Sequence, residues 1–203
     1  MKMKSFVSLA LLLGVLGWGR AEAQTHTAYR FKSEYGSTYC YKQEGCLTTD
    51  VYVFATEEAY REGRGKPPPA STYLSVSYST YNSCTGEFIG SWYGVSTTAT
   101  VNGNPSNLTA SGTVPIYNYE TGAIEYVDVN LALTANGAYR SHYVSNYQYN
   151  TPHYRYRYRS VGSSVDADVR GSVVMNGTDL LAGMTCSANI GTSKSGSIEF
   201  YRN

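Results

Sequence analysis

Tyrosine and arginine are the residues of this sequence whose number and spacing best suit ligand recognition. The sequence contains 21 tyrosines, and all of them follow residue 23. Tyrosine combines a large apolar ring with a hydroxyl group that forms hydrogen bonds, so exposed tyrosines suit a surface that holds a sugar ring or a protein. Between Tyr154 and Arg159 the two residue types alternate as YRYRYR. Such an alternation is typical of a strand whose two faces differ.

More tyrosines precede this run, in residues 136–152. This segment is long for a loop, and long loops in compact domains are usually functional or disordered. We therefore predict a tyrosine-rich loop that recognises an extracellular glycan or a protein surface, with Trp92 as a further contact if its side chain is exposed. The predicted ligand-binding residues are Tyr139, Arg140, His142, Tyr143, Tyr147, Tyr149, Tyr154, Arg155 and Trp92.

Sequence motifs that define a catalytic mechanism are missing. The sequence has no nucleophile elbow, Ser-x-x-Lys, Walker loop, dinucleotide fingerprint or His-Glu-x-x-His. Asp166 and Asp168 resemble the start of a calcium loop, but Arg170 stands where an oxygen ligand is required. We expect no metal and no cofactor, and recognition rather than catalysis. A hydrolase that uses two carboxylates remains an alternative, and its candidate residues are Glu87, Glu125, Asp128 and Glu199.

The first 23 residues have the three parts of a cleavable export signal. Lys2 and Lys4 precede an apolar run over residues 6–16, and the small-residue frame AEA follows at 21–23. The run is shorter than the roughly 20 apolar residues of a membrane-spanning helix, although an uncleaved anchor is the alternative. We expect a protein that is secreted or otherwise extracytoplasmic, in the periplasm or at the cell surface, with one domain over residues 24–203.

The net charge of the exported part is small, with 13 basic and 14 acidic residues. A nearly neutral chain creates no long-range field that would attract nucleic acid or an anionic membrane. We therefore expect neither as a partner.

Four cysteines lie in the exported part: Cys40, Cys46, Cys84 and Cys186. An even number of cysteines in an exported chain predicts disulfides. Three pairings are possible, and we favour Cys40 with Cys46, which closes a short turn, and Cys84 with Cys186. A zinc site is the competing interpretation, but the sequence lacks the paired Cys-x-x-Cys spacing.

Hydrophobic residues alternate with period two along most of the chain, as in VYVFA (51–55) and EYVDVNLAL (125–133). Turn sequences such as ETGA and ANGA separate these segments. Together these patterns predict an all-β domain, an antiparallel β-sandwich or a barrel-like variant of it. At most one short helix is expected, over residues 56–63, where a capping Thr56 precedes two glutamates.

The turn sequence VGSS predicts a hairpin that bends at residues 162–163. In that register, opposite charges face each other across the hairpin, and this would neutralise the arginines of the YRYRYR run. Only Arg155 would lack an acidic partner, because it would face Arg170. The predicted cross-strand ion pairs are Arg157 with Asp168 and Arg159 with Asp166.

Two further hairpins are predicted, one with Gly122 in its turn and one over residues 94–114. The second is small and rich in threonine, which is also typical of a hairpin that inserts into a membrane as part of a β-pore. The segment SIEFY (197–201) could instead pair with the sheet edge of a neighbouring molecule. The protein would then be a structural or adhesive subunit that assembles with copies of itself.

Overall fold

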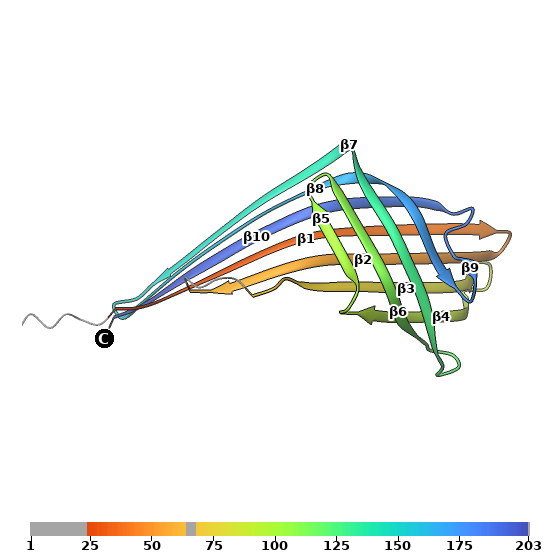
Figure 1. Cartoon of the computed structure of the whole chain (residues 1–203), viewed down its shortest axis with the longest axis horizontal. Helices are drawn as coiled ribbons and strands as arrows, with labels where there is room; N and C mark the ends of the chain where they lie inside the picture. The colour runs from red at the N-terminus through yellow and green to blue at the C-terminus, as the bar shows by residue number, and fades with distance from the viewer. Residues whose placement is uncertain (1–23, 64–67, 203) are drawn as a thin grey trace, which may run out of the picture.

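The computed structural model describes residues 24–63 and 68–202 (Figure 1), so the predicted export signal lies outside the described residues. Within the described ranges the chain forms ten strands and no helix. Accordingly, those ranges contain no helix that is long and apolar enough to cross a membrane. The strands are β1 (Gln24–Glu44), β2 (Leu47–Glu62), β3 (Ser71–Asn82), β4 (Glu87–Ser96), β5 (Thr100–Asn104), β6 (Asn107–Asn118), β7 (Ile124–Asn150), β8 (Tyr154–Met175), β9 (Thr178–Asp179) and β10 (Thr185–Arg202).

All strand pairs are antiparallel, and they form one sheet with the order β10-β1-β2-β3-β4-β6-β7-β8-β9. β10 also pairs with β8, so eight of the strands form a closed ring, while β5 pairs with β6. The predicted all-β antiparallel architecture is confirmed.

The ring encloses a core of alternate residues from its strands, as period-two alternation requires. Val51, Val53 and Ala55 of β2 are buried, while Tyr52 between them is exposed. The predicted hairpin at 94–114 contains β5 and β6, and its apolar side is buried in this core. The largest fully buried side chains include Leu74, Leu108, Ile116, Ile190, Val76, Val114, Val127 and Val173.

Four strands are much longer than the core requires: β1, β7, β8 and β10 have 21, 27, 22 and 18 residues. Figure 1 shows that they run beyond the core and taper into a narrow extension. We call this extension the stem and the part around the core the head. The stem comprises residues 24–34 of β1, 57–62 of β2, 142–150 of β7, 154–163 of β8 and 192–202 of β10.

The two disulfides join Cys40 to Cys186 and Cys46 to Cys84. Two disulfides were predicted, but the favoured pairing was wrong. Cys40 lies inside β1, directly opposite Cys186 of β10, whereas Cys46 lies beyond the end of β1 in the turn to β2. Closeness in sequence therefore did not mean closeness in space. Both bonds indicate an oxidising, extracytoplasmic environment.

The helix expected over residues 56–63 does not form, because this segment continues β2 to Glu62. Pairing with β1 provides backbone hydrogen bonds that local helix propensity does not outweigh. The Thr56 hydroxyl, predicted to cap a helix, donates instead to the Glu34 carbonyl oxygen at 3.1 Å.

The hairpin predicted at residues 162–163 is also wrong, because β8 continues without a turn from Tyr154 to Met175. Gly162 serves packing instead: a Cβ atom added there would lie 2.1 Å from the Tyr143 ring. The hairpin at Gly122 is confirmed, since Tyr117 pairs with Ile124 and Gly122 has the left-handed φ of 74°.

Removal of the Cys40–Cys186 disulfide should destabilise the protein more than removal of the Cys46–Cys84 disulfide. The bonds close chain segments of 146 and 38 residues, so they restrict the unfolded chain to different extents. We expect Cys40→Ala/Cys186→Ala to lower the free energy of unfolding by about 5 kcal/mol and Cys46→Ala/Cys84→Ala by about 4 kcal/mol. Urea denaturation of both variants measures the difference, and the reverse order would contradict the expectation.

Candidate functional site

The stem is a sheet of five strands in the order β7-β8-β10-β1-β2. Residues that face each other across these strands project from the same face of the sheet, and the next residue on each strand projects from the other. One register row contains Tyr147, Tyr158, Ser197 and Tyr29, and the next contains Asn146, Arg159, Gly196, Arg30 and Arg61. The YRYRYR run therefore belongs to a strand that separates tyrosines from arginines.

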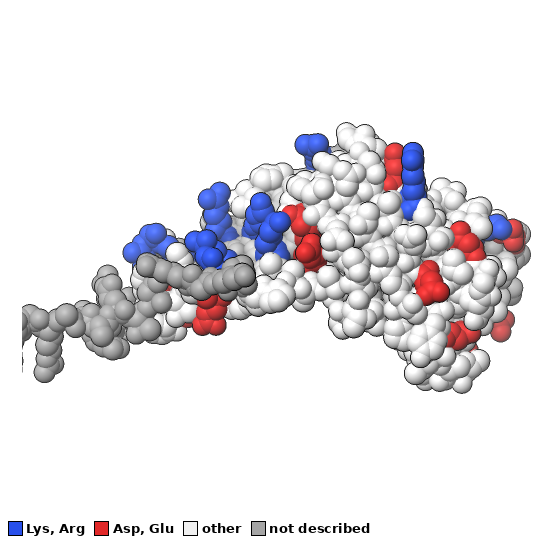
Figure 2. All heavy atoms as spheres, in the orientation of Figure 1, with Lys and Arg blue, Asp and Glu red and all other residues white. Residues whose placement is uncertain are grey.

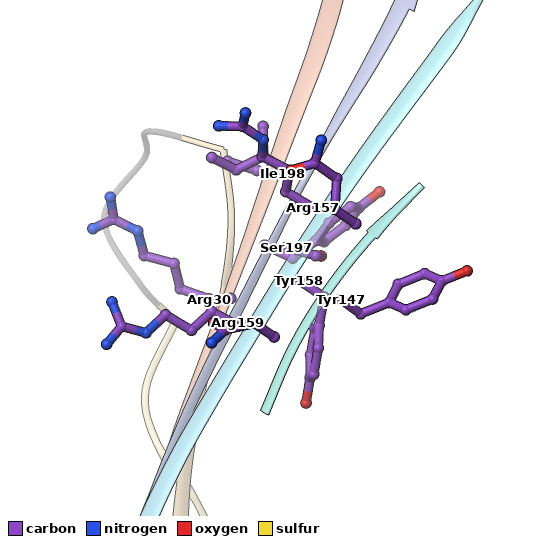
Figure 3. A pocket seen from close by; sticks show the side chains of 12 residues that line it. Arg30, Tyr147, Arg157, Tyr158, Arg159, Ser197 and Ile198 are labelled. Atoms are coloured by element: carbon purple, nitrogen blue, oxygen red, sulfur yellow. The ribbon is translucent and has the colours of Figure 1, made fainter. Parts of the chain in front are cut away.

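Basic residues gather on the face that continues the core side of the head. In Figure 2 many of the blue basic groups lie over the narrow stem and many of the red acidic groups over the head, although both parts also carry some groups of the other sign. Figure 3 shows the side chains of Arg30 and Arg159 on one side of the strands and the rings of Tyr147 and Tyr158 on the other. We call this surface the arginine face; its basic residues are Arg30, Lys32, Arg61, Arg155, Arg157, Arg159 and Lys194.

Two adjoining hollows lie along the arginine face. The first, of about 470 Å³, is lined by Arg30, Arg157 and Arg159. Tyr147 and Tyr158 also contribute to its lining, although Figure 3 shows their rings on the other side of the strands. The second, of about 740 Å³, is lined by Arg30, Arg61 and Arg159 together with Lys32 and Lys194. Both hollows include Gly196. Because they share residues, they form one continuous depression, which we call the arginine trough.

The arginines of the trough are not neutralised by the described residues. Lys32 forms an ion pair with Glu34 at 2.9 Å, but none of the trough arginines pairs with a described carboxylate. The Nε atom of Arg61 is buried without a hydrogen-bond partner among the described groups. Strands lie about 4.8 Å apart, well within the screening length of about 8 Å at physiological salt. The cations therefore repel one another and favour a bound anion.

The opposite surface, which we call the tyrosine face, carries aromatic rings from all five strands. Four ring pairs on it have centroids 5.0 to 6.2 Å apart. Tyr147 is the most exposed of its rings, at 57%. The tyrosines of this face are Tyr29, Tyr60, Tyr143, Tyr147, Tyr149, Tyr154, Tyr156, Tyr158 and Tyr201.

Tyr154 and Tyr201 on the tyrosine face have pKa values raised above the ordinary value of 10.0. The Tyr201 hydroxyl donates to Glu199 Oε2 at 3.1 Å, and this hydrogen bond raises the pKa of Tyr201. Desolvation, followed by the charge of Glu199, raises the pKa of Tyr154. A phenol with the ordinary pKa of 10.0 is already neutral at physiological pH, and the raised pKa keeps both hydroxyl groups neutral donors and acceptors to a still higher pH.

The predicted ligand-binding residues do not form one loop. Residues 142–150 belong to β7, so the predicted tyrosine-rich loop was wrong: the segment pairs with β8 along its whole length. Tyr143, Tyr147, Tyr149 and Tyr154 lie together on the tyrosine face.

The other predicted residues lie elsewhere. His142 and Arg155 are on the opposite face of the same sheet, and Arg140 lines a separate hollow of about 190 Å³ where stem and head meet. Trp92 is in the head, where it packs against Tyr78 and donates to Glu125 at 2.5 Å. The side chain of Tyr139 lies outside the part of the chain that the structure describes.

The arginines were paired with the wrong neighbours. Arg157 faces Gln148 and Ile198, and Arg159 faces Asn146 and Gly196, so the predicted ion pairs with Asp168 and Asp166 do not form. Arg155 faces Asn150 and Phe200, and Arg170 faces Ala132.

Sequence reasoning also missed the contribution of the other strands to the two faces. An aromatic residue followed by a cation occurs in Tyr29-Arg30, Phe31-Lys32 and Tyr60-Arg61. This repeated pattern, the same as in YRYRYR, was the signal that could have indicated a shared sheet.

The four candidate carboxylates of a hydrolase lie apart from the hollows described above. Glu125 accepts hydrogen bonds from Trp92 and Asn176, and Asp128 accepts one from Thr113 at 2.6 Å. Glu199 lies on the tyrosine face and Glu87 at the start of β4. Within the described ranges, no group of three or more His, Cys, Asp or Glu residues could hold a metal ion.

No protein-family model, curated protein or solved structure matches this chain. The function is therefore inferred from the geometry of the stem.

The Tyr201 phenol should ionise above its ordinary pKa of 10.0, and Glu199→Gln should lower its pKa towards that value. Because the folded protein holds this proton more tightly than the unfolded chain, the contribution to stability is complete below pH 10 and decreases as the pH rises through the raised pKa. NMR titration of ¹³C-labelled tyrosine measures the ionisation. Glu87→Gln, in the head, serves as the control, and an unchanged Tyr201 pKa in Glu199→Gln would contradict the assignment.

Proposed function

We propose that the protein is a secreted, non-catalytic recognition module that binds a glycan on the tyrosine face. The observation that carries this proposal is the collection of nine tyrosines, from five adjacent strands, on one open face of the stem. The two disulfides and the export signal expected from the sequence support an extracellular site of action.

The chemistry of the face suits a sugar ligand. Tyrosine rings provide a large contact area at low conformational cost, and their hydroxyl groups can bind ligand hydroxyl groups. Tyr143, Tyr147 and Tyr149 are all about half exposed, so their rings are accessible to a ligand and are not buried in a protein core. A group of exposed aromatic side chains on a soluble protein commonly marks an interaction site. Because Glu199 and Glu62 lie on the same face, a neutral glycan is favoured over an acidic one.

A glycan array followed by titration of the best ligand tests this proposal. The Tyr147→Ala/Tyr149→Ala variant should bind at least about fivefold more weakly, since loss of two aromatic contacts costs roughly 1 to 3 kcal/mol. The matched control is Tyr119→Ala/Tyr126→Ala, which removes two exposed tyrosines from the head. An empty array with folded protein, or equal losses in both variants, would overturn the proposal.

A second function, assembly by strand addition, is favoured by the edge of the stem sheet. Among the described residues, 142–150 of β7 pair with β8 on one side and with no strand on the other. This edge, HYVSNYQYN, contains no proline, lysine or acidic residue, the features that commonly protect sheet edges. By contrast, the predicted pairing segment 197–201 lies between β1 and β8 and offers no free edge.

If this edge pairs with another molecule, the wild-type protein should form concentration-dependent dimers or longer assemblies. Val144→Lys, at an exposed position of the edge, should shift it towards monomer because a charged residue opposes edge pairing. Light scattering coupled to size-exclusion chromatography measures both proteins. A wild-type protein that stays monomeric at high concentration would exclude this function.

A further inference from the structure

We infer that the arginine trough binds a linear polyanion, a sulfated or carboxylated polysaccharide. This site lies on the opposite face from the proposed glycan site and depends on different residues, so each can fail without the other.

The positions of the cations match an extended ligand better than a single small anion. Arg159, Arg30 and Arg61 belong to one register row that crosses the sheet from β8 to β2. Three strand spacings make this row about 14 Å wide. Lys194 and Lys32 face each other in the row nearer the head. Arg157 and then Arg155 occupy the rows nearer the tip, so the cations extend about 20 Å along the strands, at about 3.4 Å per residue.

Gly196 keeps the middle of the trough open. It occupies the place between Arg159 on β8 and Arg30 on β1 in their shared row. A Cβ atom added at this position would have only the Tyr29 carbonyl oxygen within 4 Å, at 3.3 Å, so the floor of both hollows is open here and a side chain would occupy it. The absence of a side chain therefore leaves room for a ligand group that contacts both arginines.

The guanidinium groups are available for such a ligand. In the described residues they form no ion pair, and the buried Nε of Arg61 has no hydrogen-bond partner. A guanidinium group binds sulfate or carboxylate through paired, charge-assisted hydrogen bonds. A polyanion would pair with the exposed guanidinium groups of Arg30, Arg157 and Arg159 and also reduce the repulsion among the cations.

The distribution of side chains favours a polysaccharide over nucleic acid or a membrane. Sites for single-stranded nucleic acid combine cations and stacking rings in one groove, but here the rings of Tyr147 and Tyr158 point away from the arginines (Figure 3). The cations border two open hollows, which a narrow polysaccharide chain can enter more deeply than a flat bilayer can. The disulfides place the protein in an extracytoplasmic compartment, where acidic polysaccharides are accessible ligands.

Titration of the full exported chain with three polyanions tests the inference: heparin as the sulfated probe, polygalacturonate as the carboxylated probe, and single-stranded DNA as the competing class. Vesicles of phosphatidylglycerol test the membrane alternative. The decisive variant is Arg30→Gln/Arg159→Gln, and the matched control is Lys42→Gln/Arg170→Gln, which removes two cations from the head. Circular dichroism and thermal unfolding verify that both variants fold.

We expect at least one polysaccharide to bind and the trough variant to bind it at least tenfold more weakly, while the control stays within twofold of wild type. The plot of log affinity against log salt should have a negative slope whose magnitude is about two smaller for the trough variant than for wild type. The reason is that binding releases about one counterion fewer from the polyanion for each cation that is removed. Gly196→Thr, which keeps every charge, should also weaken binding because it fills the floor. The inference is overturned if neither polysaccharide binds, if the trough variant matches the control, or if DNA or vesicles bind more tightly than both polysaccharides.

Discussion

The antiparallel register of the long strands is the constraint on which the two-faced stem depends. Because residues alternate between faces with period two, a shift of one strand by one residue would exchange its tyrosines with its arginines. In the register that the chain adopts, Tyr158 shares a row with Tyr147 and Tyr29, and Arg159 shares a row with Arg30. Every surface property of the stem follows from this alignment.

The head fixes the register that the stem continues. If a strand of the head shifted by one residue, its buried valines and leucines would move to the surface. The loss of their hydrophobic burial would strongly destabilise the fold. The Cys40–Cys186 bond joins β1 and β10 at one matched pair of positions. Farther along these strands the core ends, and Arg30, Lys32 and Lys194 occupy the positions that valine or isoleucine would occupy in the head. The same alternation thus builds a core in one half and a charged surface in the other.

Sequence patterns were sufficient for the fold class but not for the lengths of the strands. Alternation in segments such as 125–133 predicted strands because it reflects burial of one face, and Gly122 predicted a turn that forms. VGSS and ANGA were also interpreted as turns, but the first lies within β8 and the second forms only an irregularity in β7. A local turn preference is weak when a neighbouring strand offers a continuous row of hydrogen-bond partners. No single-sequence pattern shows how far that neighbour extends.

The candidate site was predictable in its residue types but not in its arrangement. The excess of tyrosine and the YRYRYR run directed attention to β7 and β8, where part of both faces lies. The net charge, close to zero, suggested the absence of a field, but folding separates the charges: the trough gathers cations while Asp166 and Asp168 lie beyond it in the head. Whole-chain charge averages over such a separation and therefore conceals it.

A stem one sheet thick has a mechanical consequence. The tyrosine rings and the guanidinium groups project from opposite faces of the same strands. No second layer of secondary structure separates them and absorbs deformation. Any change in the twist of these strands therefore alters the spacing of both sets of side chains at once. The geometry of one surface is thus coupled to the geometry of the other.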